Sequence, residues 1–270
     1  MYNTYSDIVF IIKQKKKPYY DSAAITGMEP KLYFKTEKKK ILINNARNYK
    51  NFKLDKNGFE FYKHNFNISK DKINKNIEGY KVLLSKYLKK KIPFKKIIFF
   101  DFTQRSNSKY GAYNCDGQRQ PAERAHVDYT KNSGIKRAKD ILSKKIYNKL
   151  IKEKRRIIQI NIWRPLSEKV LSSPLAFADA SSIEQRDLIA TDQLFPNRIG
   201  EIYHLAYNSN QKWYWLPNMT SNEFLVFKGW DSCNDKGIIK FTPHTSFNLA
   251  NQDIIKHPRE SIEARAFLIL

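Results

Sequence analysis

The chemistry that this sequence could perform centres on one short segment, Ala125-His126-Val127-Asp128-Tyr129-Thr130. The segment reads as a β-strand, in which residues i and i+2 project to the same face. His126 and Asp128 should therefore point together, while Val127 packs on the opposite face. An imidazole and a carboxylate can bind a metal ion together, and a second histidine would complete the facial triad that holds oxygen-activating Fe(II). By itself, a His-x-Asp pair is more often an ordinary hydrogen-bonded pair than a metal site.

The sequence contains five histidines, and one of them suits the role of the third ligand. His244 follows Pro243 in the strand-like stretch 241–247, close to the C-terminus, where a jelly-roll enzyme of this chemistry places its second histidine. His126, Asp128 and His244 are thus the candidate metal ligands and the candidate catalytic centre. The other three histidines are expected elsewhere: His64 on the surface, His204 at a core or surface position of a strand, and His257 in a loop.

A co-substrate with a distal carboxylate would need an arginine, because a guanidinium and a carboxylate pair through two parallel hydrogen bonds. Arg259 and Arg265 follow His244, and their even separation places them on one strand face if the strand begins at residue 259. Arg259 and Ser261 form an Arg-x-Ser pair that supplies both a charge and a hydroxyl. Arg265 lies deeper in the strand, where Glu263 or another acid could neutralise it. The sequence favours Arg259 and leaves Arg265 as the alternative.

The strand-like stretch that carries Asn161 and Trp163 alternates between isoleucines and other residues, so its two faces should differ. A polar and aromatic face beside a metal site would form a pocket wall, to which Asn161, Trp163 and the following Arg164 are expected to contribute. The alternative is that Trp163 belongs to the core and that Arg164 pairs with Asp179 or Asp187.

A series of motifs surrounds these residues from about residue 40 to the C-terminus. In order they include Gly58-Phe59, Phe100-Asp101-Phe102-Thr103-Gln104-Arg105, Gln120-Pro121-Ala122, His126-Val127-Asp128-Tyr129-Thr130, Asn161-Ile162-Trp163-Arg164-Pro165-Leu166, Trp213-Tyr214-Trp215-Leu216-Pro217-Asn218-Met219, His244-Thr245-Ser246-Phe247 and Arg259-Glu260-Ser261-Ile262-Glu263-Ala264-Arg265. Together they resemble the AsaB-type hydroxylase/desaturase family, which includes gibberellin desaturase and fungal natural-product oxygenases. The combination is specific, although no single motif is.

The resemblance implies a double-stranded β-helix core with Fe(II) held by His126, Asp128 and His244, and with 2-oxoglutarate chelating the metal. Such an enzyme uses O2 to convert 2-oxoglutarate into succinate and carbon dioxide, and an Fe(IV)-oxo then hydroxylates or desaturates the substrate. The expected substrate is a small molecule of specialised metabolism. The lysine-rich first 40 residues match nothing in the family pattern.

The elements around these motifs predict an α+β, mainly β fold with a jelly-roll (cupin-like) core, flanking helices and an N-terminal extension. Apolar residues at helical spacing predict one helix around Tyr80 to Leu88 and another over residues 134–155. No linker divides the chain, so we expect a single domain 1–270, in which residues 1–100 pack as an extension on a catalytic core 101–270. The strand-like runs are 41–44, 97–102, 122–129, 157–163, 174–179, 212–216, 223–228, 238–247 and 261–270.

The composition limits the partners of this chain. Its 270 residues are 41% hydrophobic and 14% aromatic, which is typical of a globular protein and not of a disordered one. The net charge of +24 comes mostly from short lysine runs without interleaved arginines and aromatics, so a nucleic-acid partner is not expected. Cys115 and Cys233 have no paired spacing, and no early apolar run is long enough to span a membrane. A cytoplasmic protein is expected, and a homodimer is a further expectation.

Three rival functions remain open at this point. A zinc hydrolase could use the same His-Asp-His set, but Glu123 falls on the opposite strand face and no His-Glu-x-x-His helix supplies a general base. A non-enzymatic basic protein would bind nucleic acid with a steep salt dependence and no metal requirement. An enzyme of this fold that no longer uses a co-substrate would need neither Arg259 nor Arg265.

Overall fold

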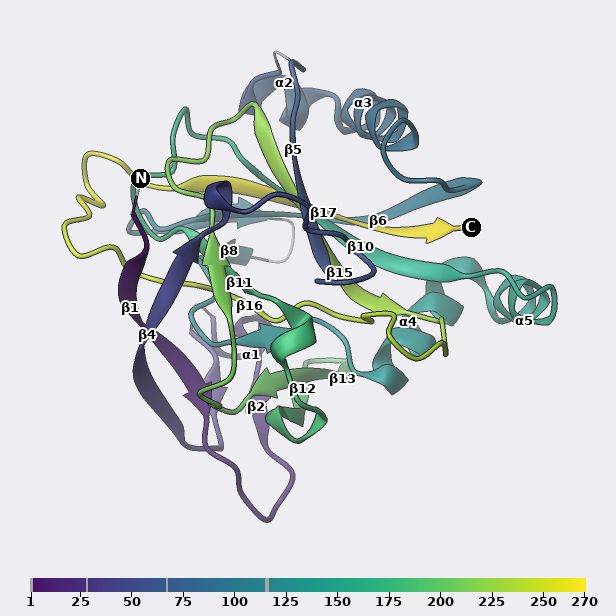
Figure 1. Cartoon of the computed structure of the whole chain (residues 1–270), viewed down its shortest axis with the longest axis horizontal. Helices are drawn as coiled ribbons and strands as arrows, with labels where there is room; N and C mark the ends of the chain where they lie inside the picture. The colour runs from purple at the N-terminus through teal and green to yellow at the C-terminus, as the bar shows by residue number, and fades with distance from the viewer. Residues whose placement is uncertain (1, 28, 67, 115–116) are drawn as a thin grey trace.

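Two β-sheets form the framework of the protein in the computed structural model, and helices lie along their margins (Figure 1). The structure describes residues 2–27, 29–66, 68–114 and 117–270, and Cys115 lies outside them. The larger sheet has ten strands in the order β1 (Thr4–Ile11), β4 (Thr36–Asn45), β14 (Trp213–Trp215), β11 (Leu175–Ala178), β16 (His244–Ser246), β9 (His126–Val127), β13 (Arg198–Leu205), β12 (Leu188–Phe195), β2 (Tyr19–Asp21) and β3 (Lys31–Leu32).

The smaller sheet is antiparallel throughout. Its order is β5 (Phe59–Lys63), β15 (Glu223–Asp231), β10 (Ile157–Pro165), β17 (Glu260–Ile269) and β6 (Lys96–Ser106), and β7 (Ala112–Asn114) and β8 (Gly117–Arg119) form a separate hairpin. The helices are α1 (Ala23–Thr26), α2 (Lys70–Lys75), α3 (Ile77–Lys89), α4 (Lys131–Leu142) and α5 (Lys144–Lys152), with short 3-10 turns at Ala46–Asn48, Ala180–Ser182 and Gln185–Asp187.

The two faces of the smaller sheet have different partners, as the alternation along β10 predicts. Three alternate isoleucines of β10, Ile158, Ile160 and Ile162, belong to the core cluster that includes the apolar stripe of α3 (Tyr80, Leu84 and Leu88). Figure 1 shows α2 and α3 on this outer side of the sheet. Asn161 and Trp163 point the other way, toward the larger sheet, where Trp163 packs with Phe177 and other residues of a second core cluster. The inner face of the smaller sheet therefore borders the space between the sheets, where the site lies.

Two features of the fold differ from the sequence prediction. The single helix expected over 134–155 is two helices, because Ser143 takes a φ of 68° and turns the chain between α4 and α5. The Ser143 side chain then accepts a hydrogen bond from the Ile146 N–H and caps α5. The hydrophobic spacing continues across this turn, which is why periodicity alone predicts one helix. The hairpin of β12 and β13 is absent from the predicted strand-like runs, although the strand expected around His204 coincides with β13.

The first hundred residues contribute strands to both sheets. β1 and β4 pair with each other and extend the larger sheet through a parallel contact between β4 and β14, while β5 pairs with β15 in the smaller sheet. The division expected near residue 100 therefore does not coincide with a break in either sheet.

His64, expected on the surface, is buried between aromatic rings. Its ring stacks on Phe66 at 4.0 Å and on Phe224 at 5.3 Å between centroids, and its Nδ1 accepts the Phe66 N–H at 3.2 Å. Burial, and then the positive charge of Arg164, lower the pKa of His64 to about 4. The folded protein thus holds this imidazole neutral under conditions in which the unfolded chain, with a pKa of about 6.5, begins to bind a proton.

We expect acid to destabilise the apo-protein partly through His64. The unfolded state takes up the proton first, so stability is lost as the pH falls below about 6.5 and continues to fall toward 4. In His64→Gln, whose carbonyl can still accept the Phe66 N–H, the loss between about pH 7.5 and pH 5 should shrink by about 1 kcal/mol in urea titrations. His257→Gln is the control because that side chain is exposed. Equal pH dependence in both variants would contradict this assignment.

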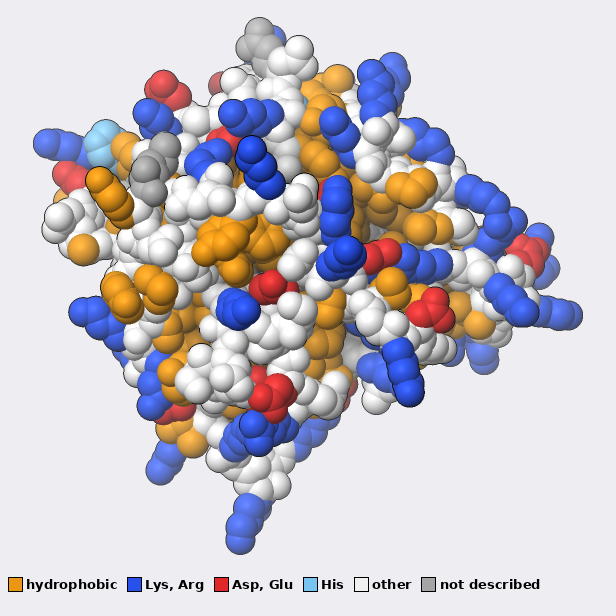
Figure 2. Space-filling model, viewed as in Figure 1, with side chains coloured by type: hydrophobic (Ala, Val, Ile, Leu, Met, Phe, Trp, Pro, Cys, Tyr) orange, Lys and Arg blue, Asp and Glu red, His pale blue; other side chains and the backbone are white. Residues whose placement is uncertain are grey.

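Positive charge covers the surface broadly. Figure 2 shows lysine and arginine side chains distributed over the visible face, many of them at its edges, with apolar patches between them. This distribution agrees with solvated lysines on many elements. None of the helices in the described part of the chain is both long and apolar enough to cross a membrane.

Candidate active site

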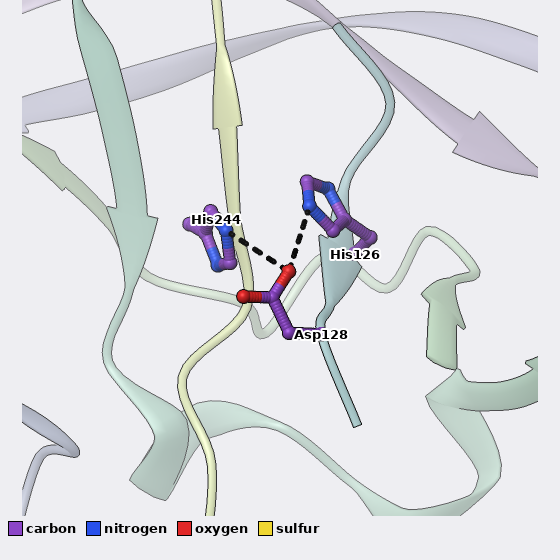
Figure 3. Close-up of side chains that lie close together, drawn as sticks. All are labelled: His126, Asp128 and His244. Carbon is purple, nitrogen blue, oxygen red and sulfur yellow. Dashed lines mark ion pairs between the residues drawn. The ribbon is translucent and has the colours of Figure 1, made fainter. Parts of the chain in front are cut away.

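The candidate ligands come together where three strands of the larger sheet run side by side. β9 lies between β13 and β16, and His126 on β9 is the direct cross-strand partner of His244 on β16. Their ring centroids are 4.4 Å apart. Asp128 follows β9, and its Oδ1 lies 3.5 Å from Nε2 of His126 and 3.9 Å from Nε2 of His244 (Figure 3). Strand pairing therefore brings together residues that are far apart in the sequence.

Both histidines are oriented by backbone carbonyls. Nδ1 of His126 lies 2.7 Å from the Arg124 carbonyl oxygen, and Nδ1 of His244 lies 3.1 Å from the Thr242 carbonyl oxygen. A carbonyl only accepts, so each Nδ1 must carry the proton and each Nε2 presents a lone pair. Such partners fix the tautomer and the ring orientation of metal-binding histidines.

The two oxygens of Asp128 have different partners. Oδ2 accepts a hydrogen bond from Asn161 Nδ2 at 2.6 Å and one from Arg265 Nε at 3.2 Å. Oδ1 faces the two histidines. Burial raises the pKa of Asp128, but Arg265 and the two imidazoles outweigh burial and hold the pKa well below its usual value. The carboxylate is thus ionised and presents one oxygen to the site.

His244 is neutral for a related reason. Burial, and then the neighbouring His126, lower the pKa of His244 to about 3. A metal ion would therefore not have to displace a proton from His244 or Asp128 at neutral pH, because neither group carries one.

This donor set fits a metal of the Fe(II) type. The three ligand atoms all lie within 4.8 Å of one another, and ligands on adjacent positions of an octahedral ion are roughly 3 Å apart for bonds of about 2.1 Å. Small side-chain movements close that gap. Two imidazole nitrogens and one carboxylate oxygen on one side of the ion leave the opposite side open for other ligands.

A pocket opens next to the ligands, between the two sheets. Arg259 lies at one end of it and is 1% exposed. Its Nη1 donates to the Ser173 carbonyl oxygen at 2.6 Å, and its guanidinium carbon lies 5.6 Å from the Trp163 ring centroid. Its Nε is buried and has no hydrogen-bond partner among the residues that the structure describes. The pocket is lined by Arg105, Ala122, His126, Trp163, Leu175, His244, Ser246, Arg259, Glu263 and Arg265.

Arg265 is committed to carboxylates of the protein. Besides Asp128, its guanidinium contacts Asp101 at 2.5 Å and Glu263 at 2.5 Å. Burial lowers the pKa of Arg265, but these acids outweigh burial and raise it well above the usual value. Arg265 therefore orients Asp128, whereas Arg259 lines the pocket and, in the described part of the chain, forms no ion pair with these acids.

Of the residues that the sequence predicts for the site, Arg164 is the one that the structure places on the opposite face of the sheet. Ser261 is buried between Arg259 and Glu263 on the inner face of β17. Arg164 lies on the outer face of β10, where its guanidinium donates to the carbonyl oxygens of Ser221 and Ile68. It also does not pair with Asp179 or Asp187. Adjacent strand residues face opposite ways, so the side chain after Trp163 points away from the pocket.

Several lining residues were not assigned to the site from the sequence, namely Arg105, Ala122, Leu175, Ser246 and Glu263. Alternation along β6 could have indicated Arg105, because Asp101, Thr103 and Arg105 occupy one face of that strand. Which face borders the site depends on how β6 pairs with β17.

Gly58 fixes the segment that precedes His244. Its carbonyl oxygen accepts a hydrogen bond from the Thr242 hydroxyl at 2.7 Å, and its φ is +94°. A Cβ at residue 58 would lie 2.4 Å from Thr242 Oγ1 and 2.9 Å from the Phe241 carbonyl oxygen. Only glycine allows this close approach, and Thr242 in turn holds the His244 imidazole.

We expect Gly58→Ala to lower stability by about 2–4 kcal/mol, since strain at positive φ adds to overpacking against the backbone. It should also weaken metal binding by moving Thr242 and His244. Gly237→Ala is a matched control, because Gly237 has a φ of +89° but nothing within 4 Å of the added Cβ. Urea unfolding and Fe(II) titration measure both effects. Equal losses in the two variants would mean that the contact with Thr242 is unimportant.

Comparisons with known proteins agree with this geometry. A family model described as "Oxidoreductase/YMDC permease-like domain" matches residues 8–269. The chain belongs to this family. Among its relatives, "Hydroxylase/desaturase CTB9" of Cercospora beticola is 28% identical over 94% of this chain and 87% of that protein. "Alpha-ketoglutarate-dependent dioxygenase tstK" of Talaromyces stipitatus is 28% identical over 85% of this chain and 84% of that protein.

The fold matches a solved structure over nearly its whole length. The "iron and alpha-ketoglutarate-dependent endoperoxidase NvfI" has a TM-score of 0.82 at 24% identity and covers 99% of this chain and 98% of that chain. The expected jelly-roll fold is confirmed, and so is the expected AsaB-type hydroxylase/desaturase family. The chain is an oxygenase of the kind that uses Fe(II), 2-oxoglutarate and O2.

Proposed function

We propose that His126, Asp128 and His244 hold the Fe(II) of this oxygenase and that Arg259 binds the distal carboxylate of 2-oxoglutarate. The observation that supports this most directly is that the two carboxylate oxygens of Asp128 have different partners. Its Oδ2 is held by Asn161 and Arg265, which leaves Oδ1 beside the two Nε2 atoms. The bound metal would supply the site at which the 2-oxo acid and O2 react.

The protein's own residues bind and orient the reactants. Arg259, with its buried and unpartnered Nε, would pair with the carboxylate end of the co-substrate. Trp163 packs beside this guanidinium and Leu175 lines the same pocket, so both would restrict water. Positioning of the target C–H bond decides where oxidation occurs.

The substrate that we propose is a small molecule of specialised metabolism, which is hydroxylated or desaturated. The relatives named as hydroxylases/desaturases support this proposal. A zinc hydrolase would need a free carboxylate as general base, but Asp128 and Glu263 both pair with Arg265.

The expected homodimer and cytoplasmic location stay predictions, which light scattering and cell fractionation would test.

The test of the metal and co-substrate assignment is an anaerobic titration of apo-protein with Fe(II) and then 2-oxoglutarate. Wild type should develop the weak visible metal-to-ligand band only when both are present. His126→Ala should not develop it, because a single imidazole and one carboxylate hold Fe(II) poorly. His257→Ala, at an exposed loop position, should behave like wild type. Absence of the band in folded wild type would overturn the proposal.

Arg259→Met should leave Fe(II) binding intact and weaken 2-oxoglutarate binding by roughly one to two orders of magnitude, since a charge-assisted bond contributes about 1.5–3 kcal/mol. Calorimetry on Fe(II)-loaded protein without O2 measures both affinities. Arg164→Met is the control, because that guanidinium is buried on the opposite face of the sheet. Unchanged 2-oxoglutarate affinity in Arg259→Met would transfer the role to another cation.

A further inference from the structure

Three arginines line the pocket beside the candidate metal ligands, and Arg265 is the one that pairs with carboxylates of the protein. Arg105 of β6 and Arg259 beside β17 both line the pocket. Their hydrogen bonds go to carbonyl oxygens, from Arg105 to Gln120 at 2.8 Å and from Arg259 to Ser173 at 2.6 Å. Within residues 2–27, 29–66, 68–114 and 117–270, neither guanidinium forms an ion pair with a carboxylate.

The pairing of β6 with β17 places both arginines on one face. Arg105 is the direct partner of Ser261, and directly opposite residues of antiparallel strands share a face. Arg259 precedes Ser261 by two residues, so its side chain points the same way. Diagonal neighbours of this kind are roughly 7–8 Å apart at the backbone, a separation that two long side chains can close around a single carboxylate.

The two charges disfavour each other as long as the pocket holds no anion. Burial, and then the nearby Arg105, lower the pKa of Arg259 to about 9. Burial likewise lowers the pKa of Arg105. Glu263 opposes part of the effect of burial on both pKa values, and a carboxylate placed between the two guanidiniums would stabilise both charges further.

The acids of the inner face are already committed to another cation. Glu263 lines the same pocket, but its Oε1 is 2.5 Å from Nη2 of Arg265. Asp101 contacts Arg265 at the same distance of 2.5 Å. Arg265 thus pairs with Asp101 of β6 and Glu263 of β17, while Arg105 and Arg259 are left for an anion from outside the chain.

We propose that Arg105 and Arg259 together form the subsite for the distal carboxylate of the 2-oxo acid. Arg105 then becomes the residue that sets the preference for a dicarboxylic over a monocarboxylic 2-oxo acid. The inference rests on the proposed function, which assigns Arg259 alone to that carboxylate. Arg105 has a structural contact as well, since its bond to the Gln120 carbonyl oxygen tethers the segment before β9, and the experiment must separate the two roles.

The probes are 2-oxoglutarate and 2-oxopentanoate, which have the same carbon chain and differ in the distal carboxylate. Binding of each is measured by calorimetry on Fe(II)-loaded protein without O2. Arg105→Met should weaken 2-oxoglutarate binding about ten-fold or more and leave 2-oxopentanoate binding unchanged, because only one probe has the second carboxylate. Arg105→Lys should restore part of the loss, and Arg105→Met/Arg259→Met should bind the two probes almost equally.

Arg137→Met is the matched control, since Arg137 lies over the Phe100 ring and does not line the pocket. Equal weakening of both probes in Arg105→Met, together with weaker Fe(II) binding, would assign Arg105 only the structural tether and overturn the inference. If Arg105→Met changes neither probe while Arg259→Met loses the discrimination, the inference fails and the proposed function stands. If Arg259→Met also retains full discrimination, the assignment of Arg259 in the proposed function fails instead.

Discussion

Asp128→Asn should strongly weaken iron binding and abolish turnover while leaving the fold intact. An asparagine side chain has one carbonyl oxygen and one NH2 group, and the structure needs acceptors on both sides of residue 128. If the oxygen faces Asn161 and Arg265, the NH2 group faces the metal and offers no lone pair. If the oxygen faces the metal, the NH2 group faces the N–H donors of Asn161 and Arg265, and neither hydrogen bond can form. We expect Fe(II) affinity to fall by about three orders of magnitude, or roughly 4 kcal/mol.

Anaerobic calorimetry and the shift of thermal unfolding by added Fe(II) both measure this loss, because a ligand stabilises the folded state by a free energy that rises with the logarithm of its affinity. Asp192→Asn is the matched control, since Asp192 makes a partly exposed ion pair with Lys17 at 2.5 Å. Retained iron affinity in Asp128→Asn would remove Asp128 from the ligand set and leave the histidine pair without its carboxylate.

Arg265→Met should combine a large loss of stability with weaker metal binding. It removes the cation shared by Asp128, Asp101 and Glu263, and breaking a buried charge pair in this way costs about 3–5 kcal/mol. Asp128 would also lose one of the two donors that orient its Oδ2. Loss of such a contact weakens metal affinity by about 10–100-fold. Urea unfolding and Fe(II) titration measure the two effects separately.

Arg47→Met is the control for this variant. Arg47 forms a comparable pair with Glu223, through hydrogen bonds of 2.7 and 2.9 Å, and it contacts none of the ligands. It should lose stability and keep its iron affinity. Arg265→Met should also keep its preference for 2-oxoglutarate over 2-oxopentanoate, and loss of that preference would mean that Arg265, rather than Arg259, binds the co-substrate.

The local patterns of the sequence were sufficient for the chemistry of the ligands and for much of the secondary structure. The alternation along β10 correctly assigned the isoleucines to one face and Asn161 to the other, and the apolar spacing correctly predicted α3. Both follow from periodicity within a single element. The same alternation could have excluded Arg164 from the pocket, because it directly follows Trp163 on the strand.

Strand lengths near the site were harder to predict. The stretch 122–129 contains only the two-residue strand β9, and 238–247 contains only β16. The backbone before each histidine is held by contacts from distant segments, such as Thr242 with Gly58 and Arg105 with Gln120. Secondary-structure propensity predicts neither contact, because each joins segments that are not neighbours in the sequence. The contact of Thr242 also requires the positive φ of Gly58, which only glycine adopts readily.

The sequence by itself predicted the kind of metal site and its three candidate donors, because residue types and a strand period of two are local properties. Only the tertiary structure decided the roles of the arginines. The register between β6 and β17 places Arg265 among three acids and leaves Arg105 and Arg259 beside the pocket. A shift of one residue in that register would reverse every side chain of the strand. Register depends on packing between segments distant in the chain, so the local pattern could favour Arg259 but could not show which acids surround Arg265 or that Arg105 borders the pocket.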